Sequence, residues 1–309
     1  MKLSQKYKNQ LKVAHEVAAN YWGQDITQLE KALSSITVLN RTGSKMVCLL
    51  PEIGTYPQSI CKIYFSGQGF QNELWGYQAA QSFKPIENIS VPPVIKFFPE
   101  KNAIISEKRT LRDSRFDILK CRKKNQTINW KNVGQWLKKF HDSQVNSVPN
   151  EQFLREKFDR IYQHLGKYGA LFSADETRSL KQVISSAQSF IGNNTQEWVL
   201  SHGDFGLGNI KTSGSMTHII DFENVTMTPR DYEATKFLSG IQSTVYFLYR
   251  HNRYESFSQD FLKGYETTIE PNPLNKFFYI LTKIDMIAKY SEHITTPGLH
   301  INKILYTSL

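Results

Sequence analysis

The chain has 309 residues, enough for one large domain or two of medium size. Hydrophobic residues make up 40% of it and charged residues 21%, which is typical of a globular protein and excludes an intrinsically disordered one. No apolar run approaches the ~20 residues of a membrane-spanning helix, and the N-terminus, MKLSQKYKNQLK, is too polar for a secretory signal.

The net charge is +10, from 38 Lys and Arg residues against 28 Asp and Glu residues. This balance fits either attraction to a polyanion, such as nucleic acid or an acidic membrane, or a Lys-rich solvated surface. The basic run at residues 120–124 has no interleaved aromatic residues and belongs to no recognisable nucleic-acid-binding module. We therefore favour the solvated surface and predict no specific nucleic-acid partner.

The three cysteines, Cys48, Cys61 and Cys121, are widely scattered. Their spacing indicates neither a disulfide framework nor a metal cluster, so a reducing cytoplasm is the expected location.

The first 107 residues are predicted to form a small lobe. Apolar residues recur at helical spacing over residues 7–33, with an interruption at Gly23 after which Asp25 is a candidate cap for a second short helix. Strands are then predicted over residues 36–40, 45–50, 58–65, 94–98 and 103–107, with one helix over residues 70–81. The turn before the second strand contains Ser44, and it is either a plain hairpin or an anion-binding nest of backbone N–H groups.

A lysine inside an apolar strand stands out in this lobe. Lys62 lies in the segment Ser-Ile-Cys-Lys-Ile-Tyr, where its charge must be paired or remain in water. Glu73 lies eleven residues later, early in the predicted helix. The two residues are either partners in an ion pair or, separately, an edge-strand lysine and an exposed helix acid.

Residues 108–309 are predicted to be mostly helical. Apolar stripes run over residues 133–141, 153–165 and 180–191, and further helices are predicted over residues 232–249, 256–268 and 274–293. Between these two groups of helices lies the stretch WVLSHGDFGLGNIKTSGSMTHIIDFENV, residues 198–225, which reads as a buried strand, a loop and a hairpin.

The hairpin stretch displays two acids and an amide at fixed spacing. Asn209 follows Asp204 by five positions, and Asp221 follows it by seventeen, at the end of the second hairpin strand. In kinase-fold enzymes a loop Asp accepts the hydroxyl proton, and an Asn and a second Asp at this spacing hold Mg²⁺ on the nucleotide phosphates. Mg²⁺ prefers oxygen ligands and takes one or two of them from the protein.

This pattern resembles the aminoglycoside phosphotransferase and choline kinase family. The residues that carry the resemblance are His202-Gly203-Asp204 through Asn209, followed by Asp221-Phe222-Glu223. Looser matches extend over about residues 36–231. The resemblance implies a two-lobed, protein-kinase-like α+β fold, with an antiparallel-sheet lobe (residues 1–107) and a mostly helical catalytic lobe (residues 108–309). It also implies transfer of the γ-phosphate of ATP, or of another NTP, to the hydroxyl of a small molecule with Mg²⁺.

The resemblance assigns roles to individual residues. Asp204 is the expected catalytic base, and Asn209 and Asp221 are the expected metal ligands. Lys62 is expected to contact the nucleotide phosphates while paired with Glu73. Three further positions are expected at the nucleotide: Ser44 in the phosphate-covering turn, and Glu107 and Arg109 at the hinge between lobes. Asp231 is expected to stabilise the catalytic loop, and Glu223 to contact a second metal or brace that loop.

A regulated protein kinase is a weaker interpretation. Gly203 precedes the catalytic acid in place of an arginine, Gly206 replaces the lysine found two positions after it, and nine residues between Asp221 and Asp231 leave no room for a long activation segment. A non-catalytic nucleotide-binding protein is the main alternative. The sequence predicts neither the oligomeric state nor the acceptor, which is left open among a sugar, an amino alcohol and an anionic metabolite.

Overall fold

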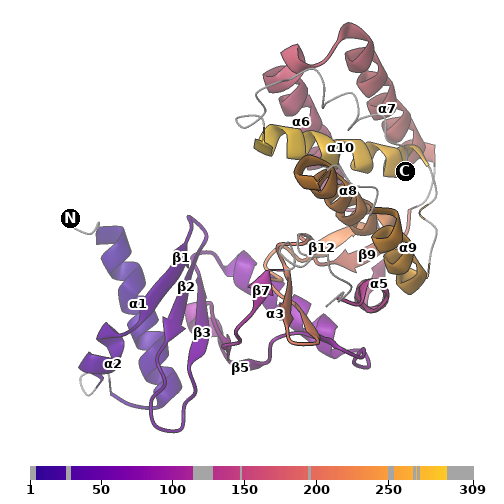
Figure 1. Cartoon of the computed structure of the whole chain (residues 1–309). Coiled ribbons are helices and arrows are strands. Elements are labelled where there is room, and N and C mark those ends of the chain that lie inside the picture. Colours follow the sequence, from indigo (N-terminus) through magenta and orange to yellow (C-terminus); the bar gives the residue numbers. More distant parts are fainter. Residues whose placement is uncertain are drawn as a thin grey trace.

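The computed structural model describes residues 5–25, 29–113, 128–146, 148–193, 196–249, 254–266, 269 and 272–290. Two parts follow one another along the chain, one built on a sheet and one mostly helical (Figure 1). The predicted α+β class is therefore confirmed. The boundary at residue 107 remains a prediction, and the basic run at residues 120–124, with Cys121, lies outside the described residues.

The N-terminal part contains a five-stranded antiparallel sheet in the order β1-β2-β3-β6-β5. Its strands are β1 (Thr37–Arg41), β2 (Lys45–Leu50), β3 (Ser59–Tyr64), β5 (Val94–Phe98) and β6 (Ala103–Glu107). A short 3-10 helix, Pro99–Lys101, joins β5 to β6. All five predicted strands are found, and alternating burial of side chains along β2 and β3 fixes these two on the sheet.

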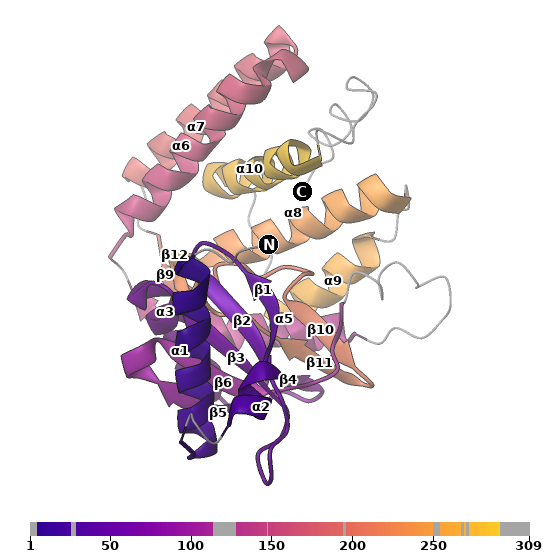
Figure 2. The same ribbon diagram turned by 90° about the vertical axis from the view of Figure 1, so that its left-hand side faces the viewer.

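Helices cover both faces of this sheet. Helix α1 (Gln5–Trp22) buries Ala14, Val17 and Ala18 in one cluster with Met46 and Cys48 of β2 (Figure 2). Helix α3 (Gly67–Gln81) contacts β3, and its Phe70 is buried with Tyr64 and Ile104. The short helix α2 (Glu30–Ser34) begins after Leu29, which is its N-cap residue in place of Asp25.

Two small sheets lie where the two parts meet. One has the order β4-β11-β10-β7 and the other β12-β9-β8. The hairpin of β10 (Ile210–Ser213) and β11 (Met216–Ile219) is flanked by β4 (Ile89–Ser90) and β7 (Arg112–Asp113), which lie on either side of β6 in the chain. The strand before the catalytic loop, β9 (Trp198–Ser201), is buried along its whole length between β8 (Val145–Asn146) and β12 (Thr226–Pro229). The hairpin that leads to Asp221 and the strand that precedes Asp204 are thus each held in a sheet.

The C-terminal part is helical, as predicted. Its α-helices are α5 (Trp130–Asp142), α6 (Glu151–Tyr168), α7 (Ala174–Asn193), α8 (Arg230–Tyr249), α9 (Tyr254–Tyr265) and α10 (Pro273–Tyr290), with a 3-10 turn at Gly169–Leu171. Helices α6, α7 and α10 share one apolar cluster, whereas α5, α8 and α9 share another with α3 and the hairpin. Within the described ranges, no helix is both long and apolar enough to cross a membrane.

Candidate active site

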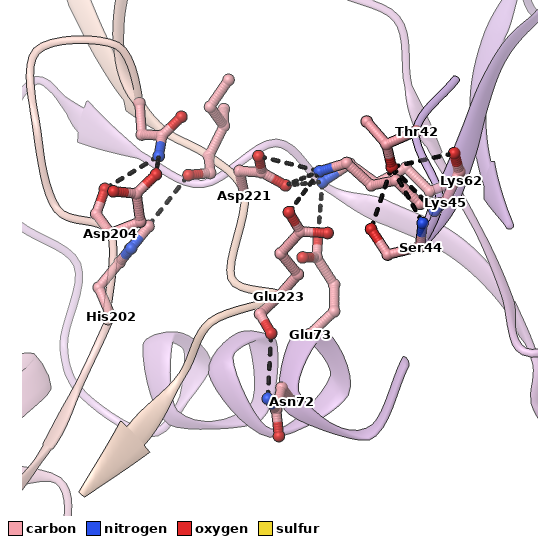
Figure 3. Close-up of polar contacts among 12 residues, drawn as sticks. Thr42, Ser44, Lys45, Lys62, Asn72, Glu73, His202, Asp204, Asp221 and Glu223 are labelled. Atoms are coloured by element: carbon pink, nitrogen blue, oxygen red, sulfur yellow. Dashed lines mark hydrogen bonds and ion pairs between the residues drawn. The ribbon is translucent and has the colours of Figure 1, made fainter. Parts of the chain in front are cut away.

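A buried ion-pair cluster joins the two parts of the molecule. Lys62 Nζ lies 2.8 Å from Glu73 Oε1 and 2.9 Å from Asp221 Oδ1. Glu73 is fully buried in α3, Lys62 lies on β3, and Asp221 follows β11 (Figure 3). The structure therefore brings together three of the residues that the sequence singled out, and it favours the ion pair over two unrelated charges.

The lysine of this cluster stays protonated. Burial alone would lower the pKa of Lys62, but the charges of Glu73, Tyr64 and Asp221 outweigh burial and hold it well above its usual value. Burial likewise opposes ionisation of Asp221, but Lys62 and Lys45 hold its pKa well below the usual range. Each charged group is stabilised by an opposite charge at close range, as buried ions require.

The position of Asp221 is fixed by its backbone and by its neighbour. Asp221 has φ of 73°, in the left-handed region where residues other than glycine are uncommon. Phe222 is fully buried and packs on Gly76 of α3, where an added Cβ would lie 2.4 Å from the Phe222 Cβ. Phe222 thereby seats the end of β11 against α3 and aims the adjacent carboxylate at the two lysines.

Lys45 is a site residue that the sequence analysis missed. It is the first residue of β2, and its Nζ lies 3.0 and 3.2 Å from the two carboxylate oxygens of Asp221 and 2.8 Å from Glu223 Oε1. The sequence did contain a signal for this residue. Lys45 is a charged residue at the start of an apolar strand, just as Lys62 is a charged residue inside one. Glu223 pairs with Lys45, and its backbone carbonyl accepts a hydrogen bond from Asn72.

Asp204 is held differently, on an open loop. Its side chain is 57% exposed. The Asn209 amide donates to the Asp204 carbonyl at 2.9 Å and to its Oδ2 at 3.0 Å. In Figure 3 Asp221 lies between Asp204 on one side and the two lysines on the other. The Asn209 carbonyl also accepts from the backbone N–H of Ile220, which ties Asn209 to the residue before Asp221.

Glu233 of α8 supports the loop from below. Its fully buried carboxylate accepts from the backbone N–H groups of His202 at 2.8 Å, Gly203 at 2.6 Å and Phe205 at 3.4 Å. The loop passes so close to the next turn that an added Cβ at Gly203, whose φ is +80°, would lie 1.9 Å from the Asn224 carbonyl oxygen. Sequence reasoning assigned support of the loop to Asp231, whose carboxylate accepts from Asn275 at 2.9 Å; its role at the loop remains a prediction.

Two histidines complete this support. His141 of α5 contacts Glu233 through Nε2 at 3.1 Å and the Tyr265 hydroxyl through Nδ1 at 2.7 Å. His202 contacts the Ile220 carbonyl through Nε2 at 3.0 Å. The support therefore runs from α9 through α5 and α8 to the loop, in a region from which water is largely excluded.

Lys236, one turn after Glu233, is a further residue that the sequence analysis missed. Its Nζ donates to the Gly203 carbonyl at 3.1 Å and lies 3.4 Å from Asp204 Oδ1. Burial would lower the pKa of Lys236, but the charges of Tyr232, Asp204 and Glu233 raise it. A protonated lysine thus lies against the exposed acid.

The remaining predicted residues lie apart from the ion-pair cluster. Ser44 sits in a turn where the Thr42 hydroxyl accepts from the N–H groups of Ser44 and Lys45, at 3.3 and 3.1 Å. Glu107 ends β6 and pairs with Arg109 at 3.0 Å. Their roles at a nucleotide remain predictions.

A cleft of about 1360 Å³ opens beside Asp204 and Asn209. It is bounded by α3, the catalytic loop, α6, α8 and α10. Arg160 and His164 of α6 both contact Asp285 Oδ1 of α10 at 2.7 Å, so charged groups from two helices meet across its wall. The cleft places the exposed acid where a small molecule can reach it.

The acids present suit a hard divalent cation. Asp221 and Glu223 both lie within 3.2 Å of the same Lys45 nitrogen, so their oxygens converge on one point as cation ligands do. In the described part of the chain, no three His, Cys, Asp or Glu side chains form a metal cluster. Mg²⁺ sites in proteins use one or two carboxylates and complete the shell with phosphates and water.

The model of the choline/ethanolamine kinase family matches residues 116–270, half of the chain. The chain belongs to the choline/ethanolamine kinase family. No curated protein sequence matches this kinase significantly.

Solved structures show the same fold in other small-molecule kinases. A choline/ethanolamine kinase family protein from Mesorhizobium loti has a TM-score of 0.54 at 10% identity and covers 95% of this chain and 92% of its own. An ethanolamine kinase from Plasmodium vivax has a TM-score of 0.51 at 16% identity, over 89% and 82%. A glucosamine kinase bound to glucosamine, ADP and inorganic phosphate has a TM-score of 0.60 at 10% identity, over 88% and 82%. The predicted two-lobed, protein-kinase-like fold and family are confirmed, and the protein is a small-molecule phosphotransferase.

Proposed function

We propose that this kinase transfers the γ-phosphate of ATP to a hydroxyl group of a small molecule, with Mg²⁺ as its metal ion. The observation that carries the proposal is the meeting of Lys62 Nζ with Glu73 Oε1 at 2.8 Å and with Asp221 Oδ1 at 2.9 Å. Phosphoryl transfer depends on positioning and charge neutralisation, and this cluster supplies an ammonium for phosphate and a carboxylate for metal.

The proposal gives each residue one task. Asp204 takes the proton of the acceptor hydroxyl, because its exposed carboxylate faces the cleft. Asp221 and Asn209 are the proposed metal ligands, and bound Mg²⁺ would neutralise charge on the transferred phosphate. Lys62, oriented by Glu73, binds the nucleotide phosphates. Ser44, Glu107 and Arg109 are kept as candidate nucleotide contacts.

The cleft of about 1360 Å³ exceeds the ~300–1,000 Å³ that small-molecule sites typically enclose. Its volume therefore leaves room for an acceptor as large as a sugar. The acceptor class stays open among sugars, amino alcohols and anionic metabolites. We retain the cytoplasm as the proposed location, on the strength of the scattered cysteines.

The decisive experiment is an ATP-consumption screen against a panel of hydroxyl compounds from these three classes. Asp204→Asn is the matched control, and hydrolysis without acceptor is the background. We expect acceptor-dependent ADP formation in the wild type only. If wild type and variant bind Mg-ATP equally and neither forms ADP with any compound, the non-catalytic nucleotide-binding alternative gains support.

Calorimetry tests the nucleotide half of the proposal. Lys62→Met should weaken Mg-ATP binding by about 1.5–3 kcal/mol, the range for a hydrogen bond to a charged group. Titrating the wild type with Mg-GTP in parallel decides between ATP and another NTP. Unchanged binding in the Lys62 variant would contradict the assignment of Lys62 to the phosphates.

A further inference from the structure

The Lys45 ammonium lies where two carboxylates converge. Lys45 Nζ is 3.0 and 3.2 Å from the two oxygens of Asp221 and 2.8 Å from Glu223 Oε1 (Figure 3). Its side chain is 10% exposed. Without a cation between them, the carboxylates of Asp221 and Glu223 would repel each other, so Lys45 stabilises their close approach.

Lys45 and a metal ion compete for the same oxygens. Mg²⁺ binds oxygen ligands at about 2.0–2.1 Å in near-octahedral geometry. An ammonium group that donates to both oxygens of Asp221 occupies the directions from which such an ion would approach. The ion can bind Asp221 fully only after Lys45 has moved away.

The two lysines of the cluster differ in what else holds them. Lys62 keeps Glu73 as a partner when Asp221 is engaged elsewhere, at 2.8 Å. The described ion pairs of Lys45 are all with Asp221 and Glu223. Lys45 is therefore the lysine that loses its partners when a cation arrives.

Nucleotide phosphates would give Lys45 a new partner. Lys45 directly follows the turn of residues 42–44 and is the first residue of β2. Its side chain is a point charge on a flexible four-carbon stem with three donors, which suits it to follow a phosphate. Nucleotide phosphates carried in with the ion supply the negative charge that Lys45 gives up.

We propose that Lys45 is a nucleotide-phosphate ligand whose ammonium group takes the place of the divalent cation at Asp221 when no metal-nucleotide is bound. Metal ions without nucleotide are then excluded from the site, and metal and nucleotide bind as a unit. The inference rests on the proposed nucleotide function, because the phosphate is what draws Lys45 away.

The test compares metal binding with and without nucleotide. Mn²⁺ serves as the probe, and its binding is followed by electron paramagnetic resonance in the absence of nucleotide. We expect Lys45→Met to bind free Mn²⁺ about tenfold more tightly than wild type, and to bind Mg-ATP about tenfold more weakly in calorimetry, which corresponds to one charge-assisted contact. Lys45→Arg keeps the charge and should exclude Mn²⁺ as the wild type does.

Two controls make the result specific. Lys101→Met removes one ammonium group and one ion pair, with Glu16, from the same part of the molecule, and should change neither affinity. Adding Asp221→Asn to Lys45→Met should abolish the gained Mn²⁺ binding. Thermal unfolding of each variant confirms that it is folded.

The outcomes separate this inference from the proposed function. Unchanged or weaker Mn²⁺ binding in Lys45→Met would overturn the inference, as would unchanged Mg-ATP affinity. If the wild type binds no nucleotide with any metal, the proposed function fails. The Mn²⁺ measurement without nucleotide would still report whether Lys45 keeps the cation out.

Discussion

The two acids at the centre of the site are held by different means. Asp221 is fixed by direct ion pairs with Lys45 and Lys62, so the groups proposed to bind the nucleotide also hold one another. Asp204 is exposed on a loop whose backbone, rather than its carboxylate, is fixed from below by Glu233. Asp221 therefore belongs to a network of ion pairs, whereas Asp204 is an exposed acid, contacted by Asn209 and Lys236, on a loop held through its backbone.

This difference has a consequence for mutation. Around Asp221, removing one charge leaves a buried opposite charge without its partner, so structure and binding change together. Around Asp204, the carboxylate can be altered without disturbing the contacts that position the loop. The first two predictions test this contrast, and the next two test the support of the loop.

The largest effect is expected at the exposed acid. Asp204→Asn keeps the size of the side chain but cannot accept a proton, so kcat should fall by about 10²–10⁴ while Mg-ATP affinity stays near that of the wild type. Steady-state rates on an identified acceptor, beside calorimetry with Mg-ATP, measure both quantities. A kcat within twofold of wild type would refute the role of Asp204 as base.

At Asp221 binding and turnover should fall together. Asp221→Asn removes a negative charge from two lysines and a ligand from the metal, so we expect Mg-ATP affinity and kcat each to fall by about 10–10²-fold. Asn209→Ala should resemble it in a milder form. The same two measurements apply, and an equal loss of nucleotide affinity in the Asp204 and Asp221 variants would break the contrast between the two sides.

The sequence predicted the parts of the site whose residues are close along the chain. Lys62 lies on a strand and Glu73 on the helix that follows it, and Asp204, Asn209 and Asp221 belong to one loop and hairpin. Local spacing was therefore sufficient to group these residues. The strands and helices predicted around them follow from apolar periodicity. The catalytic roles of these five residues remain predictions.

The contacts that the sequence did not predict join distant segments. Lys45 of β2 contacts Asp221, which follows β11, and His141 of α5 contacts Glu233 of α8. Which turn of α8 faces the loop depends on how α8 packs on α5 and α9, and no local pattern specifies that. For this reason Asp231 was chosen, although the side chain two residues further along contacts the loop.

Replacing Glu233 should loosen the catalytic loop. Glu233→Gln cannot accept from all three backbone N–H groups, so we expect a loss of about 2–3 kcal/mol in the free energy of unfolding, the cost of leaving a buried polar group unsatisfied. The kcat of the variant should fall as well, because the loop positions Asp204. Urea unfolding at neutral pH measures the first effect, and stability equal to wild type would show that the support is not needed.

The same variant should change the response to acid. Burial raises the pKa of Glu233, but the hydrogen bond and charge of His141, with His202 and Lys236, lower it below its ordinary value of 4.5. A depressed carboxyl pKa contributes stability that is present above 4.5 and is lost as the pH falls through the folded-state value. The wild type should therefore lose more stability than Glu233→Gln below pH 4.5 in parallel unfolding curves, and equal losses would contradict this linkage.

The smallest effect is expected at Lys236, which touches both the loop and its acid. Its ammonium group donates to the Gly203 carbonyl at 3.1 Å and lies 3.4 Å from Asp204 Oδ1. Lys236→Met should lower kcat about tenfold, as expected for one lost charge-assisted contact, with little change in the KM for ATP. Lys236→Arg should restore most of the lost activity, whereas Lys263→Met, which breaks a surface pair with Asp260 on α9, should alter neither kcat nor KM. A kcat for Lys236→Met within twofold of the wild type would show that Asp204 is positioned by its loop and by Asn209 without the help of Lys236.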